Sequence, residues 1–434
     1  MEPQKRRPRG STKGGEFAPS ANLESTPELE VESLGAGSGS WPAVGKEEAI
    51  WTPDLNIPHS NRERRQQTGR YLRSIPPFIT DAELDVPTIL AAEIEEASNE
   101  IVRFDAEFGT VLGPYGSVLL RTEAVSSSRI EQLSASARAI ATVETGVGGT
   151  GGNAEVIVAN ARAMQSAIAA AGSLDEAAIL ETHRILMQDD QPSIAGKWRV
   201  EQNWIGPGNA GPRLASFVPP AHERVPALMA DLVAFMHRAD LPVIALVALA
   251  HAQFETIHPF IDGNGRTGRT LMHAILRDRG LTTESTVPIS AGILSNTDDY
   301  FLALTQYRFG DTDPIISMTA RSVVHAVGLG RQLVGDLRTI REGWNDYIKA
   351  RKGAMAWRLA DMLISQPVVT RELVAQRLEV GENNVDRILQ PFEEAGILVK
   401  TGSLSRGRRV WRSTEVLAAL DAFGERLGRR TLGR

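Results

Sequence analysis

Twelve consecutive residues, 258–269 with the sequence HPFIDGNGRTGR, bring several reactive side chains together in one loop. Histidine is the side chain whose ordinary pKa lies nearest neutrality, and His258 can accept a proton from a hydroxyl group. Asp262 offers the hard carboxylate oxygens that Mg²⁺ prefers. A base and a metal-binding carboxylate beside two arginines are groups that can hold a nucleotide polyphosphate next to a nucleophile. This loop is therefore the candidate site for chemistry at phosphorus.

The second half of the loop is suited to binding phosphate. Gly263 and Gly265 allow a tight turn that points backbone N–H groups at an anion, and Asn264 can donate to a phosphate oxygen. The helix expected next presents its positive end there, with Arg266 and Arg269 on one side of its first turn as bidentate phosphate partners. The alternative is an ordinary helix–loop–helix corner with two solvated arginines, because Asp-Gly and Asn-Gly are common turn dipeptides.

Helices are expected on both sides of the loop. Residues 242–254 are apolar nearly all round, which is typical of a helix at the centre of a bundle, and residues 270–279 continue as another helix. An apolar stripe from Val225 to Met236 predicts an amphipathic helix before them. Over residues 198–218, two short apolar runs flank a Gly/Pro-rich insert, which predicts a β-hairpin. The expected fold class is mainly α, a helical bundle with a β-hairpin.

Composition divides the chain into five parts. Residues 1–70 are rich in Pro, Gly, Ser and charged residues with little apolar periodicity, so we expect a disordered tail. We expect a helical region over 71–150, ending in a glycine-rich linker, and the core that bears the loop over 151–327. A polar helical connector over 328–350 then leads to a C-terminal domain over 351–434.

The C-terminal domain has the layout of a winged helix-turn-helix. Helical segments at 354–364, 369–378 and 383–395 are followed by two short strands with a basic turn between them. The expected recognition helix, 383–395, is not strongly basic, whereas the strands and their turn carry several arginines. DNA binding and a protein-docking or dimerisation role therefore both remain open for this domain.

The overall composition excludes several classes of site. The net charge is −6, so any contact with nucleic acid must come from a local patch. The absence of cysteine excludes disulfides, Fe–S clusters and a thiol nucleophile. The sequence lacks a run of about 18 apolar residues and a secretory signal, so we expect no membrane contact, and a cytoplasmic protein is the simplest interpretation.

The loop resembles the signature of the Fic family, HPFx(D/E)GNGRxxR, at every defined position. The family's best-known reaction is the transfer of AMP from ATP to protein hydroxyls, which implies ATP as substrate, Mg²⁺ as cofactor and a protein partner with an acceptor hydroxyl. By this resemblance His258 is the general base, Asp262 binds the metal, residues 263–266 bind the nucleotide and Arg269 grips the γ-phosphate. Members that transfer phosphate carry Lys at the position of Gly265, so the glycine favours AMP transfer.

The resemblance extends over residues 71 to about 420. The predicted hairpin at 198–218 resembles the flap with which family members hold a target segment by strand-like pairing. Tyr300 lies where members carry a tyrosine near the nucleotide, and an ordinary helix aromatic is the alternative. Family members often form dimers through the core, so the resemblance also implies a homodimer.

Residues 127–131, SSRIE, resemble the inhibitory helix of many Fic proteins, (S/T)xxxE(G/N). Ser127 and Glu131 are four residues apart and share a helix face. A carboxylate paired with Arg269 would occupy the partner of the γ-phosphate and block productive ATP binding. Gln132 departs from the pattern, which has Gly or Asn there. The alternatives for Glu131 are a surface residue and a carboxylate that orients water to remove AMP from a target.

Three functions follow from these patterns. The leading hypothesis is an autoinhibited protein adenylyltransferase that modifies a Tyr, Thr or Ser hydroxyl, with His258 as base and Glu131 as the inhibitory residue. The second is a DNA-binding regulator whose core senses nucleotide. The third is a hydrolase that strips AMP from a modified protein.

Overall fold

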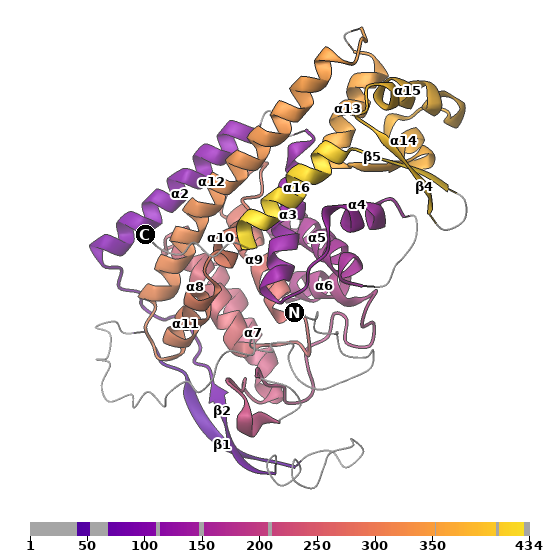
Figure 1. Cartoon of the computed structure of the whole chain (residues 1–434). Coiled ribbons are helices and arrows are strands. Elements are labelled where there is room, and N and C mark those ends of the chain that lie inside the picture. The colour runs from indigo at the N-terminus through magenta and orange to yellow at the C-terminus, as the bar shows by residue number, and fades with distance from the viewer. Residues whose placement is uncertain are drawn as a thin grey trace.

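The computed structural model of the chain describes residues 41–52, 68–109, 113–146, 152–206, 211–351, 353–404 and 408–428. Within these residues the architecture is mainly helical, with two small sheets at opposite ends of the molecule (Figure 1). The expected fold class, mainly α, is confirmed. None of the helices described is long and apolar enough to cross a membrane.

The elements before the loop are strands β1 (Gly45–Trp51) and β2 (Gly69–Ile75), and helices α2 (Thr88–Gly109), α3 (Tyr115–Ile130), α4 (Ala137–Glu144), α5 (Asn153–Ala169), α6 (Glu176–Met187) and α7 (Val225–Met236), with the 3-10 turns η1 (Ala171–Ser173), η2 (Pro212–Leu214) and η3 (His222–Arg224). Around and after the loop come α8 (Val243–Ile257), α9 (Asn264–Asp278), α10 (Ile289–Leu294), α11 (Thr297–Arg308), α12 (Asp313–Gly343) and η4 (Trp344–Asp346).

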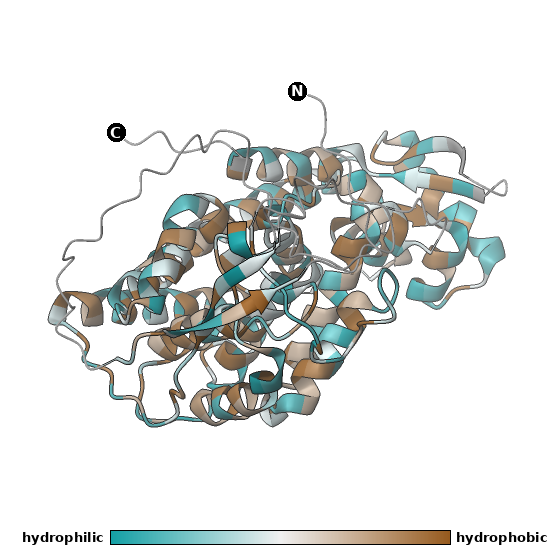
Figure 2. Cartoon of the chain, turned by 90° about the horizontal axis from the view of Figure 1, so that it is seen from below, coloured by the Kyte–Doolittle hydropathy of each residue, from teal (hydrophilic) through white to brown (hydrophobic). Residues whose placement is uncertain are grey.

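Helix α8 is the centre of the bundle. Every residue from Ile244 to Ile257 is buried, as the apolar run predicted. It packs against α7, α9 and α12, while the helices at the surface expose hydrophilic residues and turn hydrophobic ones inward (Figure 2). Because α8 and α9 are both buried, the loop between them is anchored at each end by the core.

Helix α12 runs along much of the molecule, with α2 packed beside it (Figure 1). Its 31 residues include most of the segment that we expected to be a separate connector, 328–350. The expected boundary at residue 327 therefore falls inside one continuous helix. Val323, Val327 and Leu333 are all buried on its inner face, so tertiary packing continues the helix through a segment whose composition is polar.

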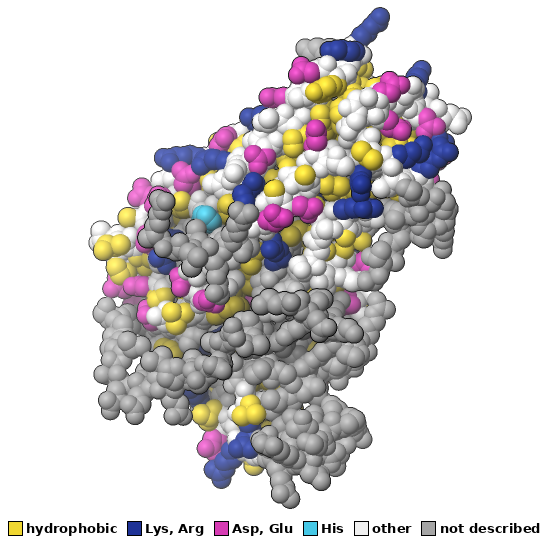
Figure 3. All heavy atoms as spheres, in the orientation of Figure 1, with side chains coloured by type: hydrophobic (Ala, Val, Ile, Leu, Met, Phe, Trp, Pro, Cys, Tyr) yellow, Lys and Arg dark blue, Asp and Glu magenta, His cyan; other side chains and the backbone are white. Residues whose placement is uncertain are grey.

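The C-terminal part consists of α13 (Met355–Ser365), β3 (Val368–Thr370), α14 (Arg371–Leu378), α15 (Glu382–Glu394), β4 (Val399–Leu404), β5 (Arg408–Arg412) and α16 (Thr414–Gly428). Its sheet has the order β3-β5-β4, so the antiparallel pair β4–β5 lies where a two-stranded wing was predicted. Helix α16 then returns to pack along α12. On the face seen in Figure 3, basic and acidic side chains are interspersed over this part of the molecule.

The prediction of a disordered tail over residues 1–70 is wrong for residues 41–52. Strand β1 pairs with β2 in an antiparallel hairpin, and the Trp41 ring packs edge-on against Phe235. These partners come from distant parts of the chain, so the local composition could not reveal them. Residues 1–40 and 53–67 lie outside the described residues, as does most of the predicted glycine-rich linker at 146–152.

The predicted β-hairpin at 198–218 is smaller than expected. Its two sides form a single antiparallel bridge, Ile205 to Phe217, and the turn η2 lies between them. Strand β2 adds a backbone bond from Ser74 N to Val218 O at 3.0 Å. We call residues 199–206 and 215–220 the flap. The flap is held by neighbouring segments more than by its own strand pairing.

Candidate active site

The base predicted from sequence lies at the end of α8. His258 caps this helix in the left-handed conformation, with φ 50° and ψ 60°. A residue with a Cβ is strained there by about 1–2 kcal/mol, so neighbouring contacts must hold it. The buried Arg199 does so, because its Nε donates to His258 O at 2.9 Å and its backbone N donates to Pro259 O at 2.9 Å.

Asn264 braces the loop internally. Its Oδ1 accepts from Phe260 N, and its Nδ2 donates to Phe260 O, both at 2.8 Å. The Phe260 ring is fully buried and stacks on His183 with 3.6 Å between ring centres. The amide predicted to bind phosphate therefore uses its oxygen and one of its two N–H donors to fix the shape of the turn.

Gly263 begins helix α9 with φ 77°, a conformation that favours glycine. A Cβ at this position would also lie 3.0 Å from Met187 Sδ. The requirement for glycine read from the sequence is therefore both conformational and steric.

His183, on helix α6, supports the part of the loop that carries Asp262. Its Nδ1 accepts from Gly196 N at 3.0 Å, so Nε2 carries the hydrogen and donates to Asp262 O, also at 3.0 Å. Burial lowers the pKa of His183 to about 4, which keeps this tautomer neutral near pH 7. The sequence did not indicate this contact, because the two residues are 79 positions apart.

Asp262 has partners on both carboxylate oxygens. Oδ2 accepts from Gln191 Nε2 at 2.5 Å, and Oδ1 accepts from Gly263 N at 2.6 Å and lies 3.4 Å from Arg266 Nη2. No group of three or more His, Asp or Glu residues able to hold a metal occurs in the part of the chain that the structure describes. A single partly exposed carboxylate fits Mg²⁺ only if the ion takes its other ligands from phosphate and water, which is usual for this metal.

Glu131 lies between the two predicted phosphate-binding arginines. Its Oε2 accepts from Arg266 Nε at 2.8 Å, and its Oε1 accepts from Arg269 Nη2 at 2.7 Å. Arg269 also donates from Nε to Ser127 Oγ at 2.8 Å and from Nη2 to Ser127 O at 2.9 Å. We call these four residues the glutamate clamp. Its two guanidinium groups are almost fully enclosed, with 2% and 1% of the side chains exposed.

The clamp depends on how α3 ends and on the absence of a side chain in the loop. Glu131 is the C-cap of α3, and Gln132 follows in the left-handed conformation with φ 62°. That conformation accounts for the Gly or Asn of the resembled pattern at this position. A Cβ on Gly265 would come 2.4 Å from Glu131 Oε1, so glycine also makes room for the Glu131 carboxylate.

Glu255 is a site residue that the sequence reading missed. Its Oε2 lies 3.7 Å from His258 Nδ1, too far for a hydrogen bond but close enough for electrostatic orientation of the imidazole. Burial would raise the pKa of the Glu255 carboxyl, but His258, His251 and Arg269 outweigh it and lower the pKa to about 2. The three-residue spacing to His258 on one helix was the available signal.

Tyr300 is present near the clamp but does not face an open site. It is 1% exposed, and its hydroxyl lies 2.8 Å from His251 Nε2. Burial lowers the pKa of His251 to about 4, so the ring is neutral and the tyrosine is its partner at the base of the site. Tyr300 lies in helix α11, which is compatible with the alternative of an ordinary helix aromatic, and its nucleotide-binding role stays a prediction.

The flap is tied to the same loop. Arg199 Nη2 donates to Pro220 O at 2.6 Å while its Nε bonds His258 O. Gln202 Nε2 donates to Pro219 O at 2.9 Å. One arginine thus couples the end of the flap to the backbone of the predicted base.

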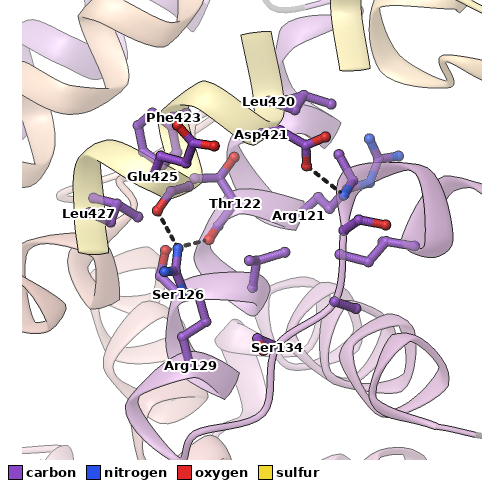
Figure 4. Close-up of a pocket in the computed structure, with 16 residues that line it drawn as sticks. Arg121, Thr122, Ser126, Arg129, Ser134, Leu420, Asp421, Phe423, Glu425 and Leu427 are labelled. Carbon is purple, nitrogen blue, oxygen red and sulfur yellow. Dashed lines mark hydrogen bonds between the residues drawn. The ribbon is translucent and has the colours of Figure 1, made fainter. Parts of the chain in front are cut away.

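Helix α3 is supported from behind by the C-terminal part. The guanidinium of Arg129, two residues before Glu131, donates to the Gly424 carbonyl of α16, and Figure 4 shows it reaching toward that helix. Asp421 accepts from Ala137 N at 2.9 Å. A cavity of about 550 Å³ remains between α3, α16 and residues 134–140. The helix that carries the clamp is therefore held by a loosely filled interface.

Comparison with known proteins finds a family match over the part of the chain that contains the signature loop. Residues 173–276 match the sequence model of the Fic/DOC family. The chain is 29% identical over 170 residues to "Protein adenylyltransferase fic-1" of Caenorhabditis briggsae, covering 38% of this chain and 30% of that protein. It is 34% identical over 146 residues to "Protein adenylyltransferase Fic" of Nematostella vectensis, covering 33% and 31%. The chain thus spans about a third of the length of these curated relatives.

Among solved structures, a Fic family protein from Desulfovibrio desulfuricans is 22% identical, with a TM-score of 0.49, over 76% of this chain and 97% of that one. A fragment of Fic-1 from C. elegans is 21% identical, with a TM-score of 0.45, over 58% and 74%.

Proposed function

We propose that the chain is a protein adenylyltransferase of the Fic/DOC family, whose sequence model matches residues 173–276, and that it is held inactive by its own Glu131. The observation that supports this proposal most directly is the arrangement of the signature loop, with His258 and Asp262 on one side of a glycine turn and two enclosed arginines on the other. The names of the relatives supply the expected reaction.

The proposed chemistry begins at His258. Nδ1–H faces Glu255, which leaves the Nε2 lone pair to accept the proton of the target hydroxyl. The freed oxygen attacks the α-phosphorus of ATP, the bond to the bridging oxygen of the β-phosphate breaks, and pyrophosphate leaves with that electron pair. A Mg²⁺ ion on Asp262 would neutralise charge on the phosphates. The N-terminal end of α9 and its arginines would hold the leaving group.

The proposed inhibition is competition for arginine. In the glutamate clamp both carboxylate oxygens of Glu131 are bonded to guanidinium groups, so a γ-phosphate cannot reach Arg269 without displacing them. Two charge-assisted hydrogen bonds in an enclosed site contribute about 1.5–3 kcal/mol each. ATP therefore has to replace contacts of comparable strength before it can bind in a productive orientation.

The test is transfer of radiolabel to protein. Full-length protein and its Glu131→Gly variant are incubated with ATP labelled on the α- or the γ-phosphate, with and without His258→Ala. We expect label from the α-position on protein, increased by Glu131→Gly and lost with His258→Ala. Label from the γ-position would instead mean phosphate transfer, and release of AMP from a pre-modified protein without new labelling would favour the hydrolase.

The C-terminal part bears on the alternative regulator function. Helix α15 exposes Glu382, Asp386 and Glu394 together with Arg387, and Asp386 pairs with Arg371. Acidic residues on a recognition helix do not favour contact with DNA phosphates. We therefore propose a protein-docking or supporting role for this part, and a gel shift with random-sequence DNA, lost on removal of residues 351–434, would contradict it.

A further inference from the structure

A basic pocket lies beside the flap, away from the glutamate clamp. It has a volume of about 400 Å³ and is bounded by the β1–β2 hairpin, the η2 segment, the flap residues Phe217 and Val218, and the end of α11. Five basic residues line it, and we call it the cationic pocket: Lys46, Arg70, Arg73, Arg213 and Arg308. No Asp or Glu is among the lining residues in the part of the chain that the structure describes.

Two of the arginines that line the pocket form ion pairs, which neutralise part of its positive charge. Arg70 pairs with Glu48 at 3.2 Å and Arg73 pairs with Glu47 at 2.8 Å, both across the β1–β2 hairpin. Arg213 donates to Thr68 O at 2.8 Å. These contacts orient the guanidinium groups but leave Lys46, exposed on β1, with no ion pair to a described residue.

Arg308 is the residue that distinguishes this pocket. Its guanidinium lies 3.6 Å from the centre of the Phe217 ring. Within the described residues it donates no hydrogen bond and forms no ion pair, and its enclosed Nε has no partner. Burial lowers the pKa of Arg308 to about 10, with Glu255 opposing the shift, so the side chain remains charged at neutral pH. A partly buried positive charge without a hydrogen-bond acceptor lowers the stability of the fold, and a bound anion would offset that cost.

The pocket is connected to the predicted base through the flap. Phe217, on whose ring Arg308 stacks, pairs with Ile205 in the antiparallel bridge of the flap. The next residue, Val218, accepts a backbone hydrogen bond from Ser74 of β2. Two residues later, Pro220 O accepts a hydrogen bond from Arg199, which also donates to His258 O. A chain segment that lies along the flap would therefore pass both the pocket and the site of transfer.

We propose that the cationic pocket receives an Asp or Glu side chain of the protein segment to be modified, so that the enzyme prefers hydroxyls in acidic sequences. This inference rests on the proposed function. Charge complementarity supports the choice of an acidic segment, and a volume of about 400 Å³ suits one or two side chains and not a folded domain. Leu72 and Phe309, with 52% and 65% of their surface exposed, add apolar contact at the rim.

The test measures binding apart from catalysis. Two fluorescein-labelled 12-residue peptides with one central tyrosine, one flanked by glutamates and the other by glutamines, are titrated with the full-length protein at low salt, without ATP. Fluorescence anisotropy is expected to show about 10-fold tighter binding of the acidic peptide, a difference that shrinks as salt rises. Arg308→Gln should reduce the affinity for the acidic peptide about 5-fold or more and leave the neutral peptide unchanged.

Two further variants keep the result interpretable. Lys46→Glu changes an exposed strand residue and should weaken binding of the acidic peptide. This variant remains informative if Arg308→Gln perturbs folding, which thermal denaturation would reveal. Arg358→Gln removes an exposed arginine of α13 and should have no effect. Equal binding of the two peptides, or acidic-peptide affinity unchanged by both pocket variants, would overturn the inference. Displacement of the acidic peptide by Mg-ATP would also overturn it, because the pocket would then hold nucleotide phosphate.

Transfer of labelled AMP separates this inference from the proposed function. In the Glu131→Gly background, the acidic peptide should have a lower KM than the neutral peptide at similar kcat, and Arg308→Gln should raise that KM. This result would support both the proposed function and the pocket. Transfer to both peptides with equal KM refutes the pocket and leaves the adenylyltransferase intact. Selective binding with no transfer to any protein or peptide refutes the adenylyltransferase and leaves the pocket as an acidic-peptide site.

Discussion

The glutamate clamp and the cationic pocket both contain arginines, but within the described residues the clamp arginines pair with a carboxylate, whereas Arg308 of the pocket does not. Arg266 and Arg269 meet the Glu131 carboxylate and the Ser127 hydroxyl within hydrogen-bond distance. In the part of the chain that the structure describes, the Arg308 guanidinium meets the face of the Phe217 ring and no hydrogen-bond acceptor. On the proposal above, the chain's own carboxylate closes the clamp, whereas the pocket receives the carboxylate of a partner segment.

Burial explains why the two regions differ in this way. The clamp arginines are almost completely removed from water, where an unpaired charge would cost several kcal/mol. Arg308 is only partly buried, and stacking on Phe217 compensates some of the lost hydration. A state without a ligand is therefore tolerable in the pocket but not in the clamp.

The largest effect is expected at the predicted base, which belongs to the candidate active site and not to the cationic pocket. Removing the base with His258→Ala in the Glu131→Gly background should lower AMP transfer by about 10²–10⁴-fold, because general-base catalysis contributes roughly that factor. Peptide binding to the cationic pocket should stay unchanged. Labelling from α-labelled ATP and anisotropy in parallel would show it, and a loss of both readouts would mean that the two regions are not separable.

Opening the clamp is expected to have the next largest effect. Glu131→Gly should bind Mg-ATP about 10–100-fold more tightly, while the nucleotide-free protein should lose about 3 kcal/mol of unfolding free energy, because two buried arginines are left unpaired. Calorimetric titration and urea denaturation with and without Mg-ATP measure the two quantities. The inhibitory role is refuted if ATP affinity and labelling stay at the unmodified level.

Acid should lower the stability of the core around His251, near the glutamate clamp, before it affects the cationic pocket. The pKa of buried His251 is lowered to about 4, so as pH falls below about 6.5 the unfolded chain binds a proton that the folded chain does not. Stability should therefore fall between pH 6.5 and pH 4, by at most about 1.4 kcal/mol per pH unit from this group. Guanidinium groups in general stay protonated over this range, because their ordinary pKa lies above 12.

Urea denaturation at pH 7 and pH 5 checks this prediction, with His251→Gln as the comparison. The dependence of the unfolding free energy on pH should be shallower in the variant. If both proteins show the same dependence, His251 is not the group responsible.

A smaller effect is expected where α16 supports the clamp helix. Arg129→Gln removes the bond to the Gly424 carbonyl and should raise AMP transfer by about 2–5-fold, because a net hydrogen bond contributes about 1 kcal/mol to holding α3. Arg138→Gln, on the exposed side of α4, is the matched control. Unchanged transfer in Arg129→Gln would show that the clamp does not depend on α16.

The smallest effect is expected from replacing the pocket arginine with an apolar residue. Arg308→Met should change the free energy of unfolding by less than about 1 kcal/mol, since no hydrogen bond is lost, whereas Arg269→Met should cost about 3–5 kcal/mol. Thermal or urea denaturation of the two variants makes the comparison direct. Equal losses would show that Arg308 has a structural role like that of the clamp arginines.

Local patterns were enough to predict the elements around the site. The apolar run before residue 258 predicted the buried helix α8, and the glycine turn predicted the start of α9, because both depend on residues within one or two helical turns. The disordered tail and the separate connector were wrong in part. Strand β1 and the second half of α12 are ordered by partners far along the chain, which no local window includes.

The sequence by itself determined the chemical groups of the loop and the backbone geometry at Gly263, since these follow from residue type and short-range sterics. Resemblance to a known signature suggested Glu131 as a partner of Arg269. Only the tertiary structure decided that Glu131 also bonds Arg266, that Glu255 faces His258, and that Arg308 stacks on Phe217 with no carboxylate partner among the described residues. Those contacts depend on how α3, α8, α9 and the flap pack together, and packing sums many weak interactions between residues far apart in sequence.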